Sequence, residues 1–204
     1  YWKKFTTLKV YPFKPVKKNL LLFLPLVVVS ASNFAYLLYV PQDIVGSVSW
    51  TLPLSMILTV FTALKEEAIF RLLLIPNLNM VKSRFWRVII SAAIFGVAHI
   101  TNFLITFDPQ YLIQIAYTFG LGIVLGFVYE YGRSISMCIG FHFLFNVIND
   151  TIYKSITNGI SNLPAYFIIN TAVALFAGLY LLTIYLMVIK KENPQADLPF
   201  IRVE

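Results

Sequence analysis

Residues 64–74 read Leu64-Lys65-Glu66-Glu67-Ala68-Ile69-Phe70-Arg71-Leu72-Leu73-Leu74, so two adjacent glutamates stand inside a strongly apolar stretch. An ionisable side chain at bilayer depth costs at least about 2.5 kcal/mol, so such a cluster needs partners inside the protein. In a helix of about 100° per residue, Glu67 and Arg71 share a face and can form an ion pair. Glu66 points about 100° away and is left to face another helix. This division suits a working carboxylate beside a structural ion pair.

The composition of the chain is that of a membrane protein. Of its 204 residues, 59% are hydrophobic and 12% are charged, and the mean hydropathy is +0.78. A soluble domain has about 25% charged residues. The net charge of +7 does not indicate nucleic-acid binding, because the basic residues cluster beside apolar segments. The single cysteine, Cys138, excludes an internal disulfide.

A helix needs about 20 residues to cross the hydrocarbon layer. We predict an all-α, polytopic transmembrane bundle of about six spans with a core of antiparallel helices. The predicted spans are about 20–40, 45–78, 85–104, 111–131, 135–152 and 165–189. We expect a basic N-terminal segment over 1–18, one transmembrane domain over 19–190 and a tail over 191–204. In the fourth span, Gly122 and Gly126, with Gly120 alongside, predict a close helix contact.

Lysine and arginine predict the orientation of the spans. Basic residues crowd the N-terminal segment and recur after alternate spans, with Lys154 as the one exception. This pattern places both termini in the cytoplasm. The compact core suggests a bacterial protein of the cytoplasmic membrane. The lipid bilayer is an expected partner, because anionic lipids attract the basic N-terminal segment. The chain begins with Tyr1, not methionine, which leaves an earlier start open.

Three further polar residues in apolar segments have reason to meet Glu66. These are His99, His142 and Asn146, and the last two are four residues apart on one helix face. A glutamate and a histidine in a partly dry cavity can activate a water, while a second histidine and an amide can stabilise an oxyanion. Alternatively, Glu66, His99 and His142 are a possible catalytic zinc ligand set. The residues leave both versions open.

Each feature also has a simpler interpretation. Glutamates near a helix end can lie at the membrane interface, and a lone histidine or asparagine can serve as an interhelical hydrogen bond. Interfacial positions are the simplest interpretation of Tyr117, Tyr129, Glu130 and Tyr131. A transporter with a proton or ion pathway would use similar groups, although the sequence shows no internal repeat.

Three motifs in order resemble the CAAX protease and bacteriocin-processing (CPBP, or Abi) family of intramembrane proteases. They are Glu-Glu-x-x-x-Arg at 66–71, Phe-x-x-x-His at 95–99 and His-x-x-x-Asn at 142–146. The resemblance covers about 51–150. Phe70 fits the usual first motif, whereas Leu72 replaces a frequent glycine, which bears on local packing.

The resemblance implies an endopeptidase that hydrolyses a peptide bond of a membrane-associated peptide or protein. It implies that Glu66 and His99 activate water, that His142 and Asn146 support the oxyanion or a metal, and that Glu67 and Arg71 are supporting residues. Relatives have been described both as metalloproteases and as metal-free glutamate proteases, so a divalent metal such as zinc is left open. Eukaryotic relatives trim prenylated tails, while bacterial ones are linked to peptide maturation or bacteriocin self-immunity. The alternative is a non-catalytic membrane regulator or immunity protein with the same fold.

Overall fold

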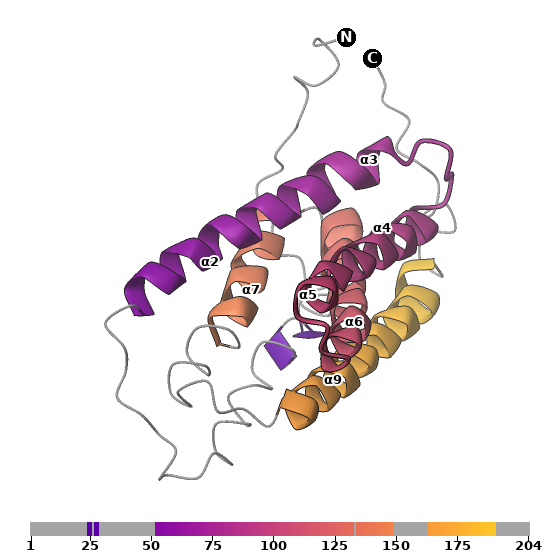
Figure 1. The fold of residues 1–204 in the computed structure, drawn as a ribbon. Helices are drawn as coiled ribbons and strands as arrows, with labels where there is room; N and C mark the ends of the chain where they lie inside the picture. Colours follow the sequence, from indigo (N-terminus) through magenta and orange to yellow (C-terminus); the bar gives the residue numbers. More distant parts are fainter. Residues whose placement is uncertain (1–23, 26, 29–51, 133, 149–162, 191–204) are drawn as a thin grey trace.

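The computed structural model describes residues 24–25, 27–28, 52–132, 134–148 and 163–190 (Figure 1). These residues are mainly helical and contain no strand, which confirms the all-α prediction for this part of the chain. The elements from residue 52 onward are α2 (Leu52–Glu67), η3 (Ala68–Leu74), α3 (Ile75–Asn77), α4 (Arg84–Ala98), α5 (Ile100–Thr106), α6 (Gln110–Gly132), α7 (Ile135–Asn146), α9 (Leu163–Ile184) and η5 (Tyr185–Ile189).

Two of the six predicted spans have described helices that are long and apolar enough to cross a membrane. They are Arg84–Thr106 and Tyr111–Gly132, the third and fourth predictions. The stretches Ile135–Asn146 and Ala174–Met187 are apolar but shorter. The prediction over 20–40 lies almost wholly outside the described residues, as do 149–152 at the end of the fifth. The described helices therefore support a membrane bundle and leave the number of spans a prediction.

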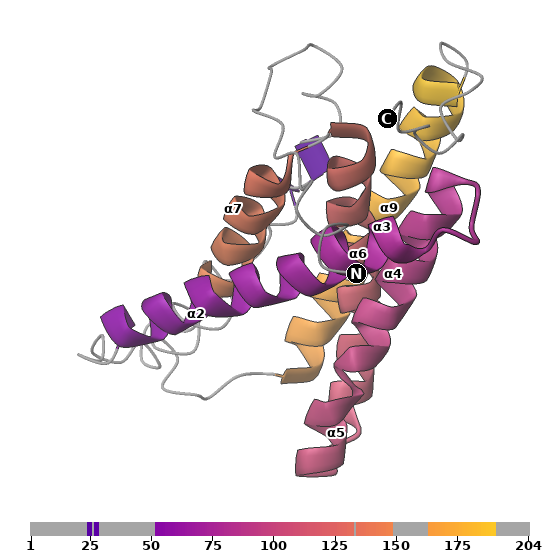
Figure 2. The same ribbon diagram turned by 90° about the horizontal axis from the view of Figure 1, so that it is seen from above.

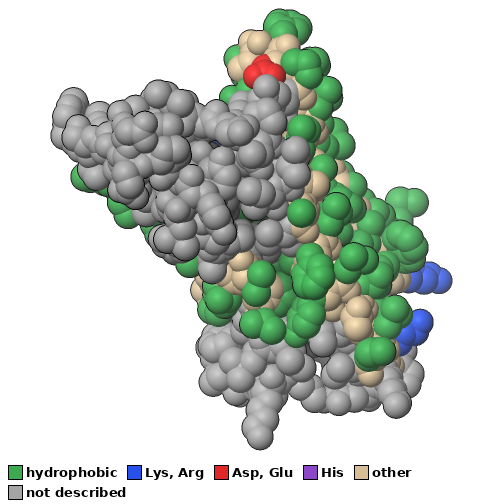
Figure 3. All heavy atoms as spheres, turned by 90° about the horizontal axis from the view of Figure 1, so that it is seen from below, with side chains coloured by type: hydrophobic (Ala, Val, Ile, Leu, Met, Phe, Trp, Pro, Cys, Tyr) green, Lys and Arg blue, Asp and Glu red, His purple; other side chains and the backbone are tan. Residues whose placement is uncertain are grey.

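Helix α6 forms the centre of the described bundle. It packs against α4 on one side and α9 on the other, and it also contacts α5 and α7 (Figures 1 and 2). Val124, Leu125 and Val128 of α6 are completely buried. On the face shown in Figure 3, hydrophobic side chains cover most of the described surface, with basic side chains at one end. An apolar exterior around an apolar core is what a bilayer requires.

The rod formed by α2, η3 and α3 runs obliquely across the bundle beside α7 (Figures 1 and 2). Helix α7 begins after Ser134, whose hydroxyl accepts a hydrogen bond from the Met137 N–H at 3.3 Å. Ser83 does the same for α4 through the Trp86 N–H at 3.4 Å. Such N-caps satisfy backbone donors that the first turn leaves unpaired. They fix where the two histidine-bearing helices start.

The glycines of α6 allow it to approach its neighbours closely, as their spacing predicts. A Cβ on Gly122 would lie 3.0 Å from the Ala92 Cα, and one on Gly126 would lie 2.8 Å from Val88 Cγ1. Val88 and Ala92 are four residues apart on α4, so one face of α4 meets one face of α6. Both glycines thus make the α4–α6 contact.

We expect Gly122→Ala to destabilise the protein by about 1–3 kcal/mol, because the added methyl group would press on the backbone of α4. Gly140→Ala is the matched control, since a Cβ there meets nothing within 4 Å. The control should be neutral or slightly stabilising through its higher helix propensity. Thermal unfolding in detergent measures both variants. Equal melting temperatures for the two would contradict the close contact.

Candidate functional site

Three buried ionisable groups meet where the rod packs against α7. Glu67 Oε1 lies 3.2 Å from Arg71 Nη1 and 2.7 Å from His142 Nδ1. Glu67 and Arg71 are 0% exposed and His142 is 2% exposed. The ion pair suggested by the spacing of Glu67 and Arg71 is therefore present, and one carboxylate oxygen serves both partners. Pairing of this kind offsets the cost of burying each charge.

His142 stands between the two glutamates. A carboxylate only accepts hydrogen bonds, so we assign the Nδ1 proton to the contact with Glu67. The other ring nitrogen, Nε2, lies 3.5 Å from Glu66 Oε2. The Glu66 side chain is 17% exposed, against 0% for Glu67. Glu66 is therefore the glutamate that a water or substrate can reach.

A π-helical turn follows the two glutamates directly. Helix α2 ends at Glu67, and η3 runs over Ala68–Leu74. Its Phe70 carbonyl accepts a hydrogen bond from Ser91 Oγ at 3.0 Å, and its Arg71 Nη2 donates to the Gly122 carbonyl at 3.3 Å. Short π-helical turns inside α-helices are frequent at functional sites. Here the turn is tied to α4 and α6, which sets how the glutamates face α7.

Phe95 packs against both histidines. Its ring is 1% exposed, with its centroid 5.0 Å from that of His99 and 5.8 Å from that of His142. The Arg71 Cζ lies 4.8 Å from the same centroid, a cation–π geometry. The phenylalanine of the second motif thus connects the groups of all three motifs.

His99 lies at the junction of α4 and α5. Its Nδ1 is 2.9 Å from the Phe95 carbonyl oxygen. A carbonyl only accepts, so we assign a proton to Nδ1, and in the tautomer with this one ring proton Nε2 is an acceptor. The break in the helix and this hydrogen bond together fix the ring.

All four sequence-predicted catalytic residues line one cavity of about 470 Å³; they are Glu66, His99, His142 and Asn146. Glu66 and His142 are also in direct contact. The recorded ring partner of Glu66 is His142, whereas the resemblance paired Glu66 with His99. The roles that the resemblance implies for these residues stay predictions.

Sequence reasoning missed several polar residues of the same cavity wall, among them Asn102, Gln114 and Tyr117. Asn102 follows His99 by three residues, a spacing that places both on one helix face and could have drawn attention to it. Tyr117, interpreted as interfacial, is instead only 6% exposed. Gln114 gave no signal beyond being a polar residue in an apolar segment.

The hypothesis of a bound metal requires a group of ligands within the described part of the chain. Across those residues, no three His, Cys, Asp or Glu side chains are grouped closely enough to hold an ion. Each histidine directs Nδ1 to a protein acceptor, which is Glu67 for His142 and the Phe95 carbonyl for His99, and this leaves Nε2 of each ring as the nitrogen that could bind a metal. Among the described residues, Glu66, His99 and His142 are not gathered as a three-ligand zinc site, and the choice between a metal-dependent and a metal-free site stays a prediction.

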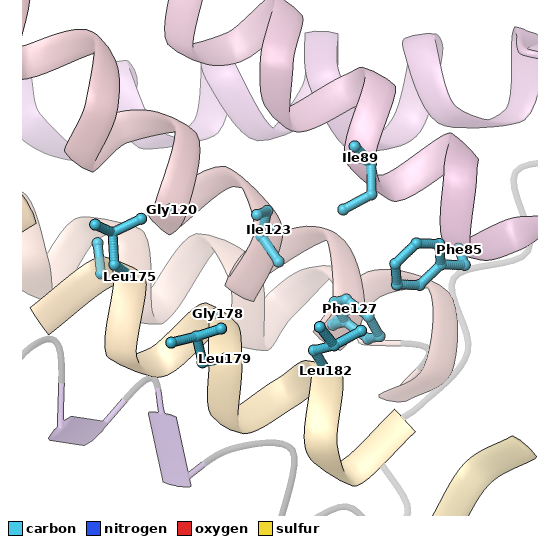
Figure 4. A pocket seen from close by; sticks show the side chains of 10 residues that line it. Phe85, Ile89, Gly120, Ile123, Phe127, Leu175, Gly178, Leu179 and Leu182 are labelled. Atoms are coloured by element: carbon cyan, nitrogen blue, oxygen red, sulfur yellow. The ribbon is translucent and has the colours of Figure 1, made fainter. Parts of the chain in front are cut away.

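Two other features lie outside this cavity. Arg87 and Glu130 form an ion pair between α4 and α6, with Nη2 and Oε1 3.8 Å apart. Glu130 is 8% exposed, so its carboxylate is buried against α4 near the end of α6. Between α4, α6 and α9 lies an apolar pocket of about 160 Å³ whose wall includes Ile89, Ile123 and Leu179 (Figure 4). Its lining has no ionisable side chain and offers no catalytic group.

Comparison with protein families gives one match. Residues 48–148 match the family described as Rce1-like, type II CAAX prenyl endopeptidase Rce1-like. The matched range contains all three motifs and every residue of the cavity wall named above. Comparisons with curated proteins and with solved structures gave no match.

Proposed function

The chain belongs, through residues 48–148, to the Rce1-like family of type II CAAX prenyl endopeptidases, and we propose that it hydrolyses a peptide bond of a membrane-associated peptide or protein. One observation carries this proposal. Glu66, His142, Glu67 and Arg71 form a continuous chain of polar contacts that opens onto a cavity in an apolar bundle. Buried ionisable groups among membrane helices are costly and are typically kept for function.

Glu66 is the proposed general base. Glu66 and the Nε2 of His99 orient a water, and Glu66 takes one of its protons. The hydroxide attacks the scissile carbonyl carbon, and the Asn146 side-chain amide donates a hydrogen bond to the oxyanion that forms. Glu66 then returns the proton to the amide nitrogen as the carbon–nitrogen bond breaks. The products are a carboxylic acid and an amine.

His142, Glu67 and Arg71 are the proposed positioning residues. The contact with Glu67 fixes the ring orientation of His142, so that its Nε2 faces Glu66. Arg71 offsets the buried charge of Glu67. This proposed mechanism uses residues of the chain alone.

The cellular setting is a separate proposal from the sequence. The distribution of lysine and arginine supports one transmembrane domain over 19–190 with both termini in the cytoplasm. Bacterial peptide maturation or bacteriocin self-immunity would suit such a protease.

Hydrolysis in labelled water tests the reaction directly. The full chain in liposomes is incubated in H₂¹⁸O with a peptide that ends in a farnesylated CAAX sequence, the substrate class in the family's name. We expect cleavage, with one ¹⁸O in the new carboxylate, because water supplies the attacking oxygen. Mass spectrometry of the fragments measures it, and empty liposomes are the control. A folded protein that binds this peptide and leaves it intact would favour the non-catalytic regulator.

A further inference from the structure

A pair of amide side chains lies on the cavity wall away from the glutamates. Asn102 Nδ2 donates a hydrogen bond to Gln114 Oε1 at 2.8 Å, which joins α5 to α6. Both residues are half-buried, and both line the cavity that contains Glu66 and His99. The proposed hydrolysis does not use either of them. Their mutual hydrogen bond uses only one donor and one acceptor, so other polar atoms of the pair are left for a ligand in the cavity.

The pair presents one acceptor and one donor to the cavity. After the mutual hydrogen bond, Asn102 retains its Oδ1 and Gln114 retains its Nε2 N–H groups. Within the described part of the chain, no further partner is recorded for either atom. Exchanging the oxygen and nitrogen of both amides would reverse the roles and still leave one acceptor and one donor. The chemical character of the pair is therefore independent of that assignment.

A peptide group is the ligand that matches this pattern. Its N–H would donate to one amide oxygen and its C=O would accept from the other amide nitrogen. We propose that Asn102 and Gln114 form a subsite that binds one backbone peptide group of an extended substrate. The proposal rests on the proposed peptidase function, because it takes the substrate to be a peptide chain in this cavity.

The position of the pair sets which peptide group it holds. Asn102 lies three residues beyond His99, and the backbone N–H of Asn102 donates a hydrogen bond to the His99 carbonyl at 3.1 Å. Three residues of helix rise about 4.5 Å. An extended chain advances about 3.3 Å per residue. The bound peptide group therefore lies one or two residues from the scissile bond, which fixes the register of cleavage.

An ester scan in a variant that does not turn over tests the subsite. The probe is the farnesylated CAAX peptide with single backbone amides replaced by esters, which removes one N–H at a time. Its affinity is measured by fluorescence anisotropy on full-length Glu66→Gln in liposomes. We expect one ester position to weaken binding about fivefold, the worth of one hydrogen bond. The same ester should have no effect when Asn102→Leu and Gln114→Leu are added together, whichever amide oxygen accepts the N–H.

Asn77→Leu is the matched control, because Asn77 is an exposed asparagine of α3 outside the cavity. In that background the ester effect should remain. The subsite would be overturned if no ester position weakened binding. It would also be overturned if the ester effect were the same in the presence and in the absence of the Asn102 and Gln114 amides. Hydrolysis by the wild-type protein would still stand in that case. Conversely, a peptide held through Asn102 and left intact by the wild-type protein would support the subsite and refute the proposed function.

Discussion

Glu66→Gln is expected to lower the rate of peptide hydrolysis by about 10²- to 10⁴-fold, the range that general-base catalysis provides. The glutamine keeps the size of the side chain and can still contact His142, whose Nε2 lies 3.5 Å from Glu66 Oε2. It cannot accept the proton of the attacking water. Because the Glu66 side chain is 17% exposed and faces the cavity, the change should leave folding intact. Initial rates in liposomes measure the loss.

Glu130→Gln is the control for this experiment. Glu130 is a buried, paired carboxylate like those of the site, but its partner is Arg87 and it lies outside the cavity. Its variant should therefore keep a near-normal rate per folded molecule, with thermal unfolding giving the folded fraction. A folded Glu66→Gln protein that keeps more than about a tenth of the wild-type rate would contradict the role of Glu66 as general base.

Helical periodicity was sufficient to predict which residues of one helix share a face. The four-residue spacing of Glu67 and Arg71 predicted their ion pair, and that of Gly122 and Gly126 predicted a close contact, which the structure places against α4. The approximate bounds of α4 and α6 also follow from apolar length. These features depend on the spacing of residues along one helix, which can be read directly from the sequence.

Contacts between segments were harder to predict because they depend on how two helices are rotated against each other. The adjacent glutamates were assigned to separate partners, yet both contact His142. The π-helical turn at Ala68–Leu74 changes the angle per residue just after them, and no residue type there signals it. The bond from Arg71 to the Gly122 carbonyl has a backbone acceptor, which is equally invisible in a sequence. Predicting such contacts requires knowing how the helices are placed and rotated in the folded protein.

Arg71→Leu is expected to destabilise the protein by about 3–5 kcal/mol, because it leaves a buried carboxylate without its cation. Glu67 is 0% exposed, and its Oε2 has no hydrogen-bond partner among the described residues. The change also removes the bond to Gly122 and the contact with Phe95. Unfolding in detergent, followed by circular dichroism, measures the loss.

The double variant Glu67→Leu/Arg71→Leu separates stability from catalysis. Removing both charges avoids the unpaired carboxylate, so we expect the double variant to be more stable than Arg71→Leu alone. Hydrolysis should nevertheless stay low, because His142 has lost the acceptor 2.7 Å from its Nδ1 that orients its ring toward Glu66. A double variant no more stable than Arg71→Leu would show that the two charges do not act as a pair. If activity returned together with stability, His142 would not depend on Glu67 for its orientation, and the ion pair would serve the fold alone.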